Sequence, residues 1–96
     1  MRFLMIDGML SGTGVRDSRA GGYLDPKEVG LSVELIGRIE KWLSEYETAH
    51  YHDFKNEAEN HRLDLEGIEI TRQARAQLPG SKVEYFSNAR MQRITL

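Results

Sequence analysis

The chain has 96 residues, of which 40% are hydrophobic and 29% charged, and its formal net charge is −2. This length and composition predict a single globular domain over residues 1–96 and exclude wholesale disorder. The chain contains no cysteine, which excludes a disulfide scaffold, a thiolate metal site and a cysteine nucleophile. The apolar run near the amino terminus is too short for a signal peptide or a membrane span, so we expect a cytoplasmic protein.

The charge is unevenly distributed along the chain. Residues 25–61 carry four basic and nine acidic groups, a net charge of −5. An acidic surface repels phosphate backbones and attracts basic ones, so we expect no nucleic-acid partner for this segment. A basic protein surface is the partner that the charge favours. The alternative is that these acids only keep an exposed helix face soluble.

The first third of the chain predicts one strand and then a long loop. Residues 2–6 form a short apolar run that is typical of a buried strand. Residues 8–30 contain six of the nine glycines and are expected to form a loop. We expect its residues 8–24 to be mobile, because ordering glycines is costly in conformational entropy. The segment lacks the spacing and the lysine of a phosphate-binding loop.

Two amphipathic helices are expected in the middle of the chain. Ser32 is a favourable N-cap, and apolar residues at spacings of three and four predict a helix over 32–50. A second stripe predicts a helix over 62–78, which Pro79 and Gly80 would end. The small residues Gly67 and Ala74 on this stripe would allow close approach of a neighbouring element.

The carboxyl-terminal residues predict two further strands, at 82–87 and 91–95. Together these elements favour an α/β fold, a two-layer sandwich with two amphipathic helices on a three-stranded sheet in the order β-α-α-β-β. The predicted core consists of Leu35, Ile39, Leu43, Ile70 and Leu78, with Phe3, Met5 and either Val83 or Phe86 beneath them.

Residues 45–61, EYETAHYHDFKNEAENH, contain all three histidines of the chain. Glu47 and His50 have the i,i+3 spacing of di-iron helix bundles, but such sites need a second copy on a facing helix, which is absent. His50 and His52 diverge at a helix end. We therefore predict that His50, His52 and His61 form no metal site, and no cofactor is expected.

The sequence offers no other recognisable catalytic chemistry. A serine nucleophile would need a base and an oxyanion hole, and no G-x-S-x-G motif occurs. Carboxylates are abundant on the expected helix faces, but nothing selects a pair for acid–base catalysis. Arg72 and Arg75 share a helix face without an RNP-like aromatic pattern nearby. We therefore expect neither an enzyme nor a nucleic-acid-binding protein.

A set of motifs between residues 21 and 86 is similar to a family of small, mostly uncharacterised bacterial cytoplasmic proteins. Some members occur beside toxins, where a small acidic protein blocks a toxin domain, and the resemblance implies such an immunity-like role. The chain departs from the family in a longer loop at 11–20 and in a small residue at Ala74. The motifs are Gly21-Gly22-Tyr23-Leu24-Asp25-Pro26, Gly30-Leu31-Ser32, Trp42, Tyr46, Glu66-Gly67 and Val83-Glu84-Tyr85-Phe86.

The sequence thus predicts a non-enzymatic binding protein, an immunity-like inhibitor of a basic toxin or nuclease domain. Glu45, Glu47 and Asp53 are the candidate partner-binding residues, because acids on a rigid helix can steer a basic surface. A homo-oligomeric structural protein, including a homodimer, and a small metabolite-binding regulatory domain remain open alternatives. A metal-binding protein is a weaker one.

Overall fold

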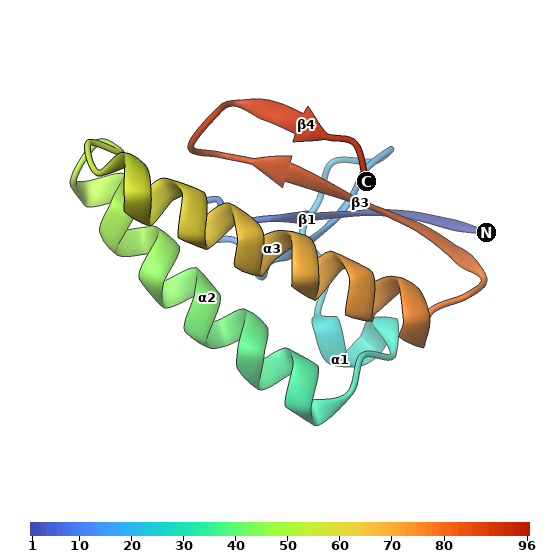
Figure 1. Ribbon diagram of the computed structural model, residues 1–96. Helices are drawn as coiled ribbons and strands as arrows, with labels where there is room; N and C mark the ends of the chain where they lie inside the picture. Colours follow the sequence, from blue (N-terminus) through green and yellow to red (C-terminus); the bar gives the residue numbers. More distant parts are fainter.

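The structure is a computed structural model that describes residues 1–96. Four strands form one sheet in the order β2-β1-β3-β4. The central strands β1 and β3 run parallel, and each edge strand is antiparallel to its neighbour. Figure 1 shows α2 and α3 side by side against one face of this sheet. The elements are β1 (Arg2–Asp7), β2 (Val15–Asp17), α1 (Pro26–Val29), α2 (Val33–Tyr51), α3 (Glu57–Gln77), β3 (Ser81–Ser87) and β4 (Gln92–Ile94).

The two-layer α/β arrangement was predicted correctly, but the prediction of three strands in the order β-α-α-β-β is wrong. The sheet has a fourth strand, β2, and the short helix α1 precedes α2. Both lie inside the segment 8–30 that was expected to be a loop. A three-residue strand between glycines is too short to show an alternating pattern, so the sequence carried no strand signal there.

The segment that contains β2 is bonded into the sheet over much of its length. The backbone of Asp7 donates to Gly14, and that of Ser18 donates to Phe3. Leu24 returns to donate its N–H to Val15, at 2.9 Å. These bonds supply contacts that offset the entropy of ordering the glycines, and the mobility of residues 8–24 stays a prediction that amide exchange would test.

Both long helices begin at side-chain caps. The Ser32 hydroxyl accepts a hydrogen bond from the Leu35 N–H, so α2 begins where the sequence predicted. Helix α3 begins at Glu57, five residues before the predicted start, because Asn56 caps it by accepting from the Glu59 N–H. The first turn of α3 is polar, and apolar periodicity therefore could not show it.

The core lies between the helices and the sheet, and the prediction was partly wrong about which residues enter it. Leu35, Ile39 and Ile70 are buried as expected, and of the alternatives Val83 and Phe86 it is Val83 that is buried, whereas Leu43 and Leu78 are only half-buried.

In β1, the prediction that Phe3 and Met5 lie beneath the helices is wrong. Leu4 and Ile6 belong to the core cluster instead, and Met5 is buried on the opposite face. Successive strand residues point to opposite faces, and an uninterrupted apolar run does not reveal which set faces inward.

Gly67 allows α3 to approach the sheet closely. A Cβ atom at this position would lie 2.3 Å from the ring of Tyr85 on β3. Gly67 was expected to allow a neighbouring element to approach closely, and that element is β3, through the ring of Tyr85. Tyr85 is itself fully buried, so the ring cannot easily move aside.

Candidate partner-binding surface

The outward face of α2 presents a continuous line of exposed residues. They recur at alternating spacings of four and three, which places them on one side of a helix. Two of them, Glu40 and Glu47, take part in no ion pair. The line consists of Val33, Gly37, Glu40, Ser44, Glu47 and Tyr51.

The three acids predicted to bind a partner do not form one set. Glu45 is half-buried between α2 and α3, where its carboxylate lies 3.4 Å from the Arg62 guanidinium. Arg62 also donates to both carboxylate oxygens of Glu59 and holds the pKa of that carboxyl below its usual range. Glu47 and Asp53, in contrast, are exposed and have no ion-pair partner. Residues 45 and 47 diverge because positions i and i+2 lie on different sides of a helix.

The connection from α2 to α3 is packed around Phe54. Its ring contacts those of His50 and Tyr46 edge-to-face, with centroids 4.7 Å and 5.9 Å away. Its carbonyl accepts a hydrogen bond from the Asn60 side chain at 2.8 Å. A cavity of about 90 Å³ lies beside this turn. Pockets for small organic ligands usually measure about 300–1,000 Å³, so this one is small for a metabolite.

The three histidines point to different surroundings. The half-buried His50 donates from Nε2 to the carbonyl of Gly8, at 3.0 Å, and so connects α2 to the end of β1. His52 and His61 are exposed. No group of three or more histidine or carboxylate side chains converges in a way that could hold a metal ion. The arrangement gives His50 a structural contact.

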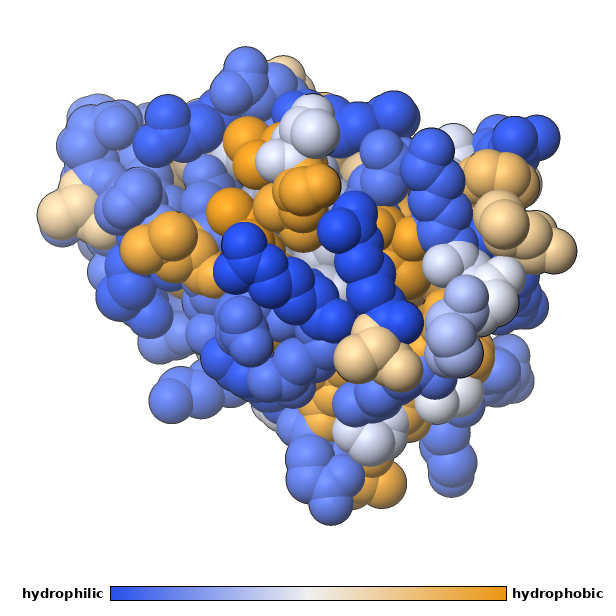
Figure 2. Space-filling model, turned by 45° about the vertical axis from the view of Figure 1, so that its right-hand side comes forward, coloured by the Kyte–Doolittle hydropathy of each residue, from blue (hydrophilic) through white to orange (hydrophobic).

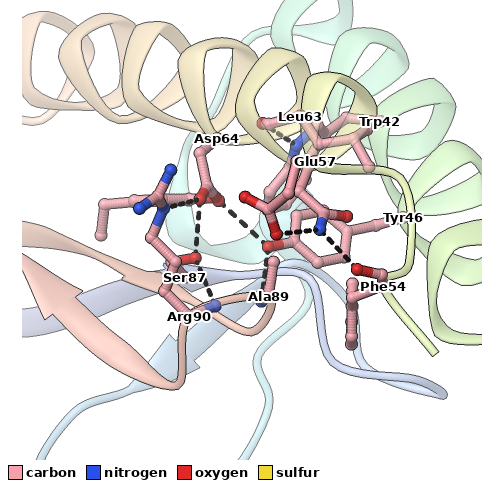
Figure 3. A network of polar contacts seen from close by, with 11 residues as sticks. Trp42, Tyr46, Phe54, Glu57, Leu63, Asp64, Ser87, Ala89 and Arg90 are labelled. Atoms are coloured by element: carbon pink, nitrogen blue, oxygen red, sulfur yellow. Dashed lines mark hydrogen bonds and ion pairs between the residues drawn. The ribbon is translucent and has the colours of Figure 1, made fainter.

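A buried carboxylate, Asp64, organises the polar interior where the helices meet the end of β3. Asp64 belongs to α3, its side chain lies in the core, and the residue is only 5% exposed. It accepts hydrogen bonds from the hydroxyls of Tyr46 (3.0 Å), Tyr85 (2.6 Å) and Ser87 (2.7 Å). Arg90 lies 3.4 Å from its second oxygen. Figure 3 shows Tyr46, Ser87 and Arg90 converging on Asp64 from α2, the end of β3 and the turn after β3.

The network also holds the backbone of that turn. The Tyr46 hydroxyl accepts from the Ala89 N–H at 3.0 Å, and the Ser87 hydroxyl accepts from the Arg90 N–H at 3.1 Å. Burial raises the pKa of both Tyr46 and Tyr85, so these phenols remain protonated donors throughout the physiological range. A buried network with every member bonded is rigid, and it fixes the turn in one position.

The sequence prediction missed this network. Asp64 sits between Leu63 and Gly67 on the inward side of α3, and a carboxylate on an apolar stripe was the available signal. Its partners could not be identified, because Tyr46 and Ser87 are 18 and 23 residues away along the chain.

In Figure 2, the hydrophobic side chains of the visible face form separate groups among hydrophilic ones. No helix is long and apolar enough to cross a membrane.

Comparison with known proteins identifies the family. Residues 4–88 match the model of a family described as Serratia CdiI immunity protein-like. No curated protein and no solved structure matches the chain. The family description indicates an inhibitor-type binding role with a toxin as protein partner, as the resemblance implied. Because the match extends from β1 to the turn after β3, the chain belongs to the Serratia CdiI immunity protein-like family.

Proposed function

We propose that the protein is a non-enzymatic inhibitor that binds a basic toxin or nuclease domain in the bacterial cytoplasm through the outer face of α2. The observation that carries this proposal is a set of free acids, two on that face and one in the turn directly after α2. Glu40, Glu47 and Asp53 are exposed, and none has an ion-pair partner within the chain. Their charge is therefore available to another molecule.

The geometry supports a steering role for these acids. Most other helix acids are already neutralised, since Glu45 and Glu59 share Arg62, and Glu66 pairs with Arg38. Free charges of one sign on a rigid helix accelerate the encounter with an oppositely charged surface, and salt screens this effect. Glu45 acts differently, by joining α2 to α3 through Arg62.

The test is the association rate with a toxin domain that the protein captures in a pull-down from its native cytoplasm. We expect the double variant Glu47→Lys, Asp53→Lys to associate about tenfold more slowly at low salt, with the difference shrinking in about 0.5 M salt. Stopped-flow fluorescence measures both rates.

A charge-matched control separates position from net charge. The double variant Glu28→Lys, Glu34→Lys changes the net charge equally, but Glu28 lies in α1 and Glu34 in the first turn of α2. We expect this control to retain most of the wild-type association rate. Equal loss in both double variants, or none in the first, would contradict the acidic-face mechanism.

A further inference from the structure

Three chain connections lie together at one end of the molecule. They are residues 8–14 after β1, residues 52–56 between α2 and α3, and residues 88–91 between β3 and β4. Figure 1 shows them on the same side, away from α1. Parallel strands place their carboxyl ends at one edge of a sheet, and β1 and β3 are parallel neighbours.

Hydrogen bonds join the first and third connections directly, and the second connection packs against His50 of α2 through the ring of Phe54. His50 donates to the Gly8 carbonyl and thereby joins α2 to the first connection. In the amide orientation that satisfies both of its polar atoms, the Asn88 oxygen accepts from the N–H groups of Gly8 (3.1 Å) and Met9 (3.3 Å). In the third connection, the hydroxyls of the Asp64 network accept hydrogen bonds from the backbone N–H groups of Ala89 and Arg90, and Asp64 pairs with the Arg90 side chain. The three connections therefore form one rigid surface.

The backbone of this surface is held in unfavourable conformations. All four non-glycine residues with positive φ in the chain lie in the three connections: Ser11 (66°), Asp53 (52°), Phe54 (53°) and Met91 (53°). Such conformations cost energy and persist only where the surroundings enforce them. Their concentration at one end indicates that the shape of this end is maintained against a local cost.

The same end exposes large apolar side chains. Met91 is 70% exposed, Met9 41% and Leu10 38%, and Tyr51 at the end of α2 is 73% exposed. We call these four residues the end patch. Methionine and tyrosine are enriched in protein interfaces, and a backbone that is already fixed loses little further entropy on binding.

We infer that the end patch is the apolar contact that holds the bound toxin, next to the acidic face that steers it. This inference rests on the proposed function. The patch is continuous with the acidic face, because Tyr51 follows Glu47 on the same line of α2 and Asp53 lies in the second connection. Its occupant is an apolar patch on the toxin that is bordered by basic residues, which would face Glu47 and Asp53.

The two regions have different kinetic roles. Apolar anchors in a complex mainly set the dissociation rate, whereas exposed charges at the rim mainly set the association rate. The double variant Met9→Ser, Met91→Asn removes two anchors without disturbing the fold, since both side chains are exposed and asparagine tolerates positive φ. We expect its complex with the captured toxin domain to dissociate at least about tenfold faster, with association within about twofold of wild type.

The matched control is Leu65→Ser, Leu96→Ser, which removes two exposed apolar side chains that belong neither to the patch nor to the exposed line of α2, 54% and 38% exposed. We expect its dissociation rate to stay within about twofold of wild type. Tyr51→Ala and Leu10→Ser, tested singly, are each expected to accelerate dissociation. Thermal unfolding of every variant checks that the fold is retained.

The outcomes separate the two proposals. An unchanged dissociation rate in Met9→Ser, Met91→Asn overturns the end-patch inference, even where the lysine reversals still slow association. A raised dissociation rate with unaffected lysine reversals supports the end patch and contradicts steering by the acidic face. If the end patch instead joins two copies of this chain, sedimentation shows a dimer that the double variant dissociates, and the dissociation rate from the toxin is unchanged.

Discussion

Helices α2 and α3 lie side by side on the same sheet but bury different kinds of side chain. The buried residues of α2 are Leu35, Ile39, Trp42, Tyr46 and Ala49, an apolar and aromatic set. Those of α3 include Asn60, Asp64 and Thr71, with Gly67 between them. Hydrophobic burial is non-directional, whereas buried hydrogen bonds and a glycine contact demand one position. α2 thus contributes mainly apolar and aromatic area, with Tyr46 bonded to Asp64, whereas α3 adds buried polar groups and a glycine contact to its apolar residues.

This difference leaves the two outward faces with different freedom. The exposed line of α2 takes no part in holding the helix, so its acids are available for a partner. On α3, the basic Arg62 is engaged by Glu45 and Glu59. The comparison predicts that substitutions of the buried residues of α3 affect folding most, and that substitutions on the outward face of α2 affect binding.

Removing the Asp64 carboxylate should have the largest effect on stability. Asp64→Ala leaves the buried hydroxyls of Tyr46, Tyr85 and Ser87 without their acceptor, and we expect a loss of about 3 kcal/mol. Urea unfolding followed by circular dichroism measures this loss. Glu47→Ala on the outer face of α2 is the control and should change stability by less than about 0.5 kcal/mol. Similar values for the two variants would remove the distinction between the helices.

Alanine in place of glycine should have opposite effects in the two helices. Gly67→Ala on α3 places a Cβ against the fixed Tyr85 ring, and we expect a destabilisation of about 2 kcal/mol from overpacking. Gly37→Ala on α2 meets no atom within 4 Å and should stabilise the protein by about 0.5–1 kcal/mol through helix propensity. Thermal denaturation of both variants provides the measurement. A stable Gly67→Ala protein would show that the contact of α3 with the sheet can relax.

An ion pair between Arg38 and Glu66 joins the two helices, and it should make the free energy of unfolding depend slightly on pH. Hydrogen bonds from Arg38 hold the pKa of Glu66 below its usual value of 4.5. The folded state therefore binds this proton less readily than the unfolded state does. The stabilisation is fully present above about pH 4.5 and is lost as the pH falls through the lower folded pKa.

Glu66→Gln tests this contribution by removing the titrating group. The variant should lose less stability than wild type between pH 6 and pH 3, with a difference below about 1 kcal/mol because the pair is partly exposed. Urea unfolding at each pH measures it. Glu59→Gln, whose partner Arg62 lies on the same helix, controls for acids that do not join α3 to α2 directly. Parallel pH profiles for wild type and Glu66→Gln would contradict the assignment.

Sequence signals between neighbouring residues were sufficient to predict the elements that carry a cap or a regular apolar spacing. Ser32 and the apolar spacing after it predicted α2, because a cap and a helical period are properties of neighbouring residues. The accumulation of acid in residues 25–61 was likewise visible without a structure. The negative charge near the end of α2, and with it Glu47 and Asp53 as candidates, was therefore accessible from the sequence.

Only the tertiary structure decided which residues meet across the chain. It showed that Leu4 and Ile6 face the helices, because strand phase depends on the neighbouring layer. It engaged Glu45 with Arg62 and left Glu47 free, although the two acids are nearly adjacent in sequence. It also placed Asp64 among hydroxyls from α2 and β3, and it gathered three distant connections into one surface. Such contacts join residues far apart in the chain, and no local pattern encodes their pairing.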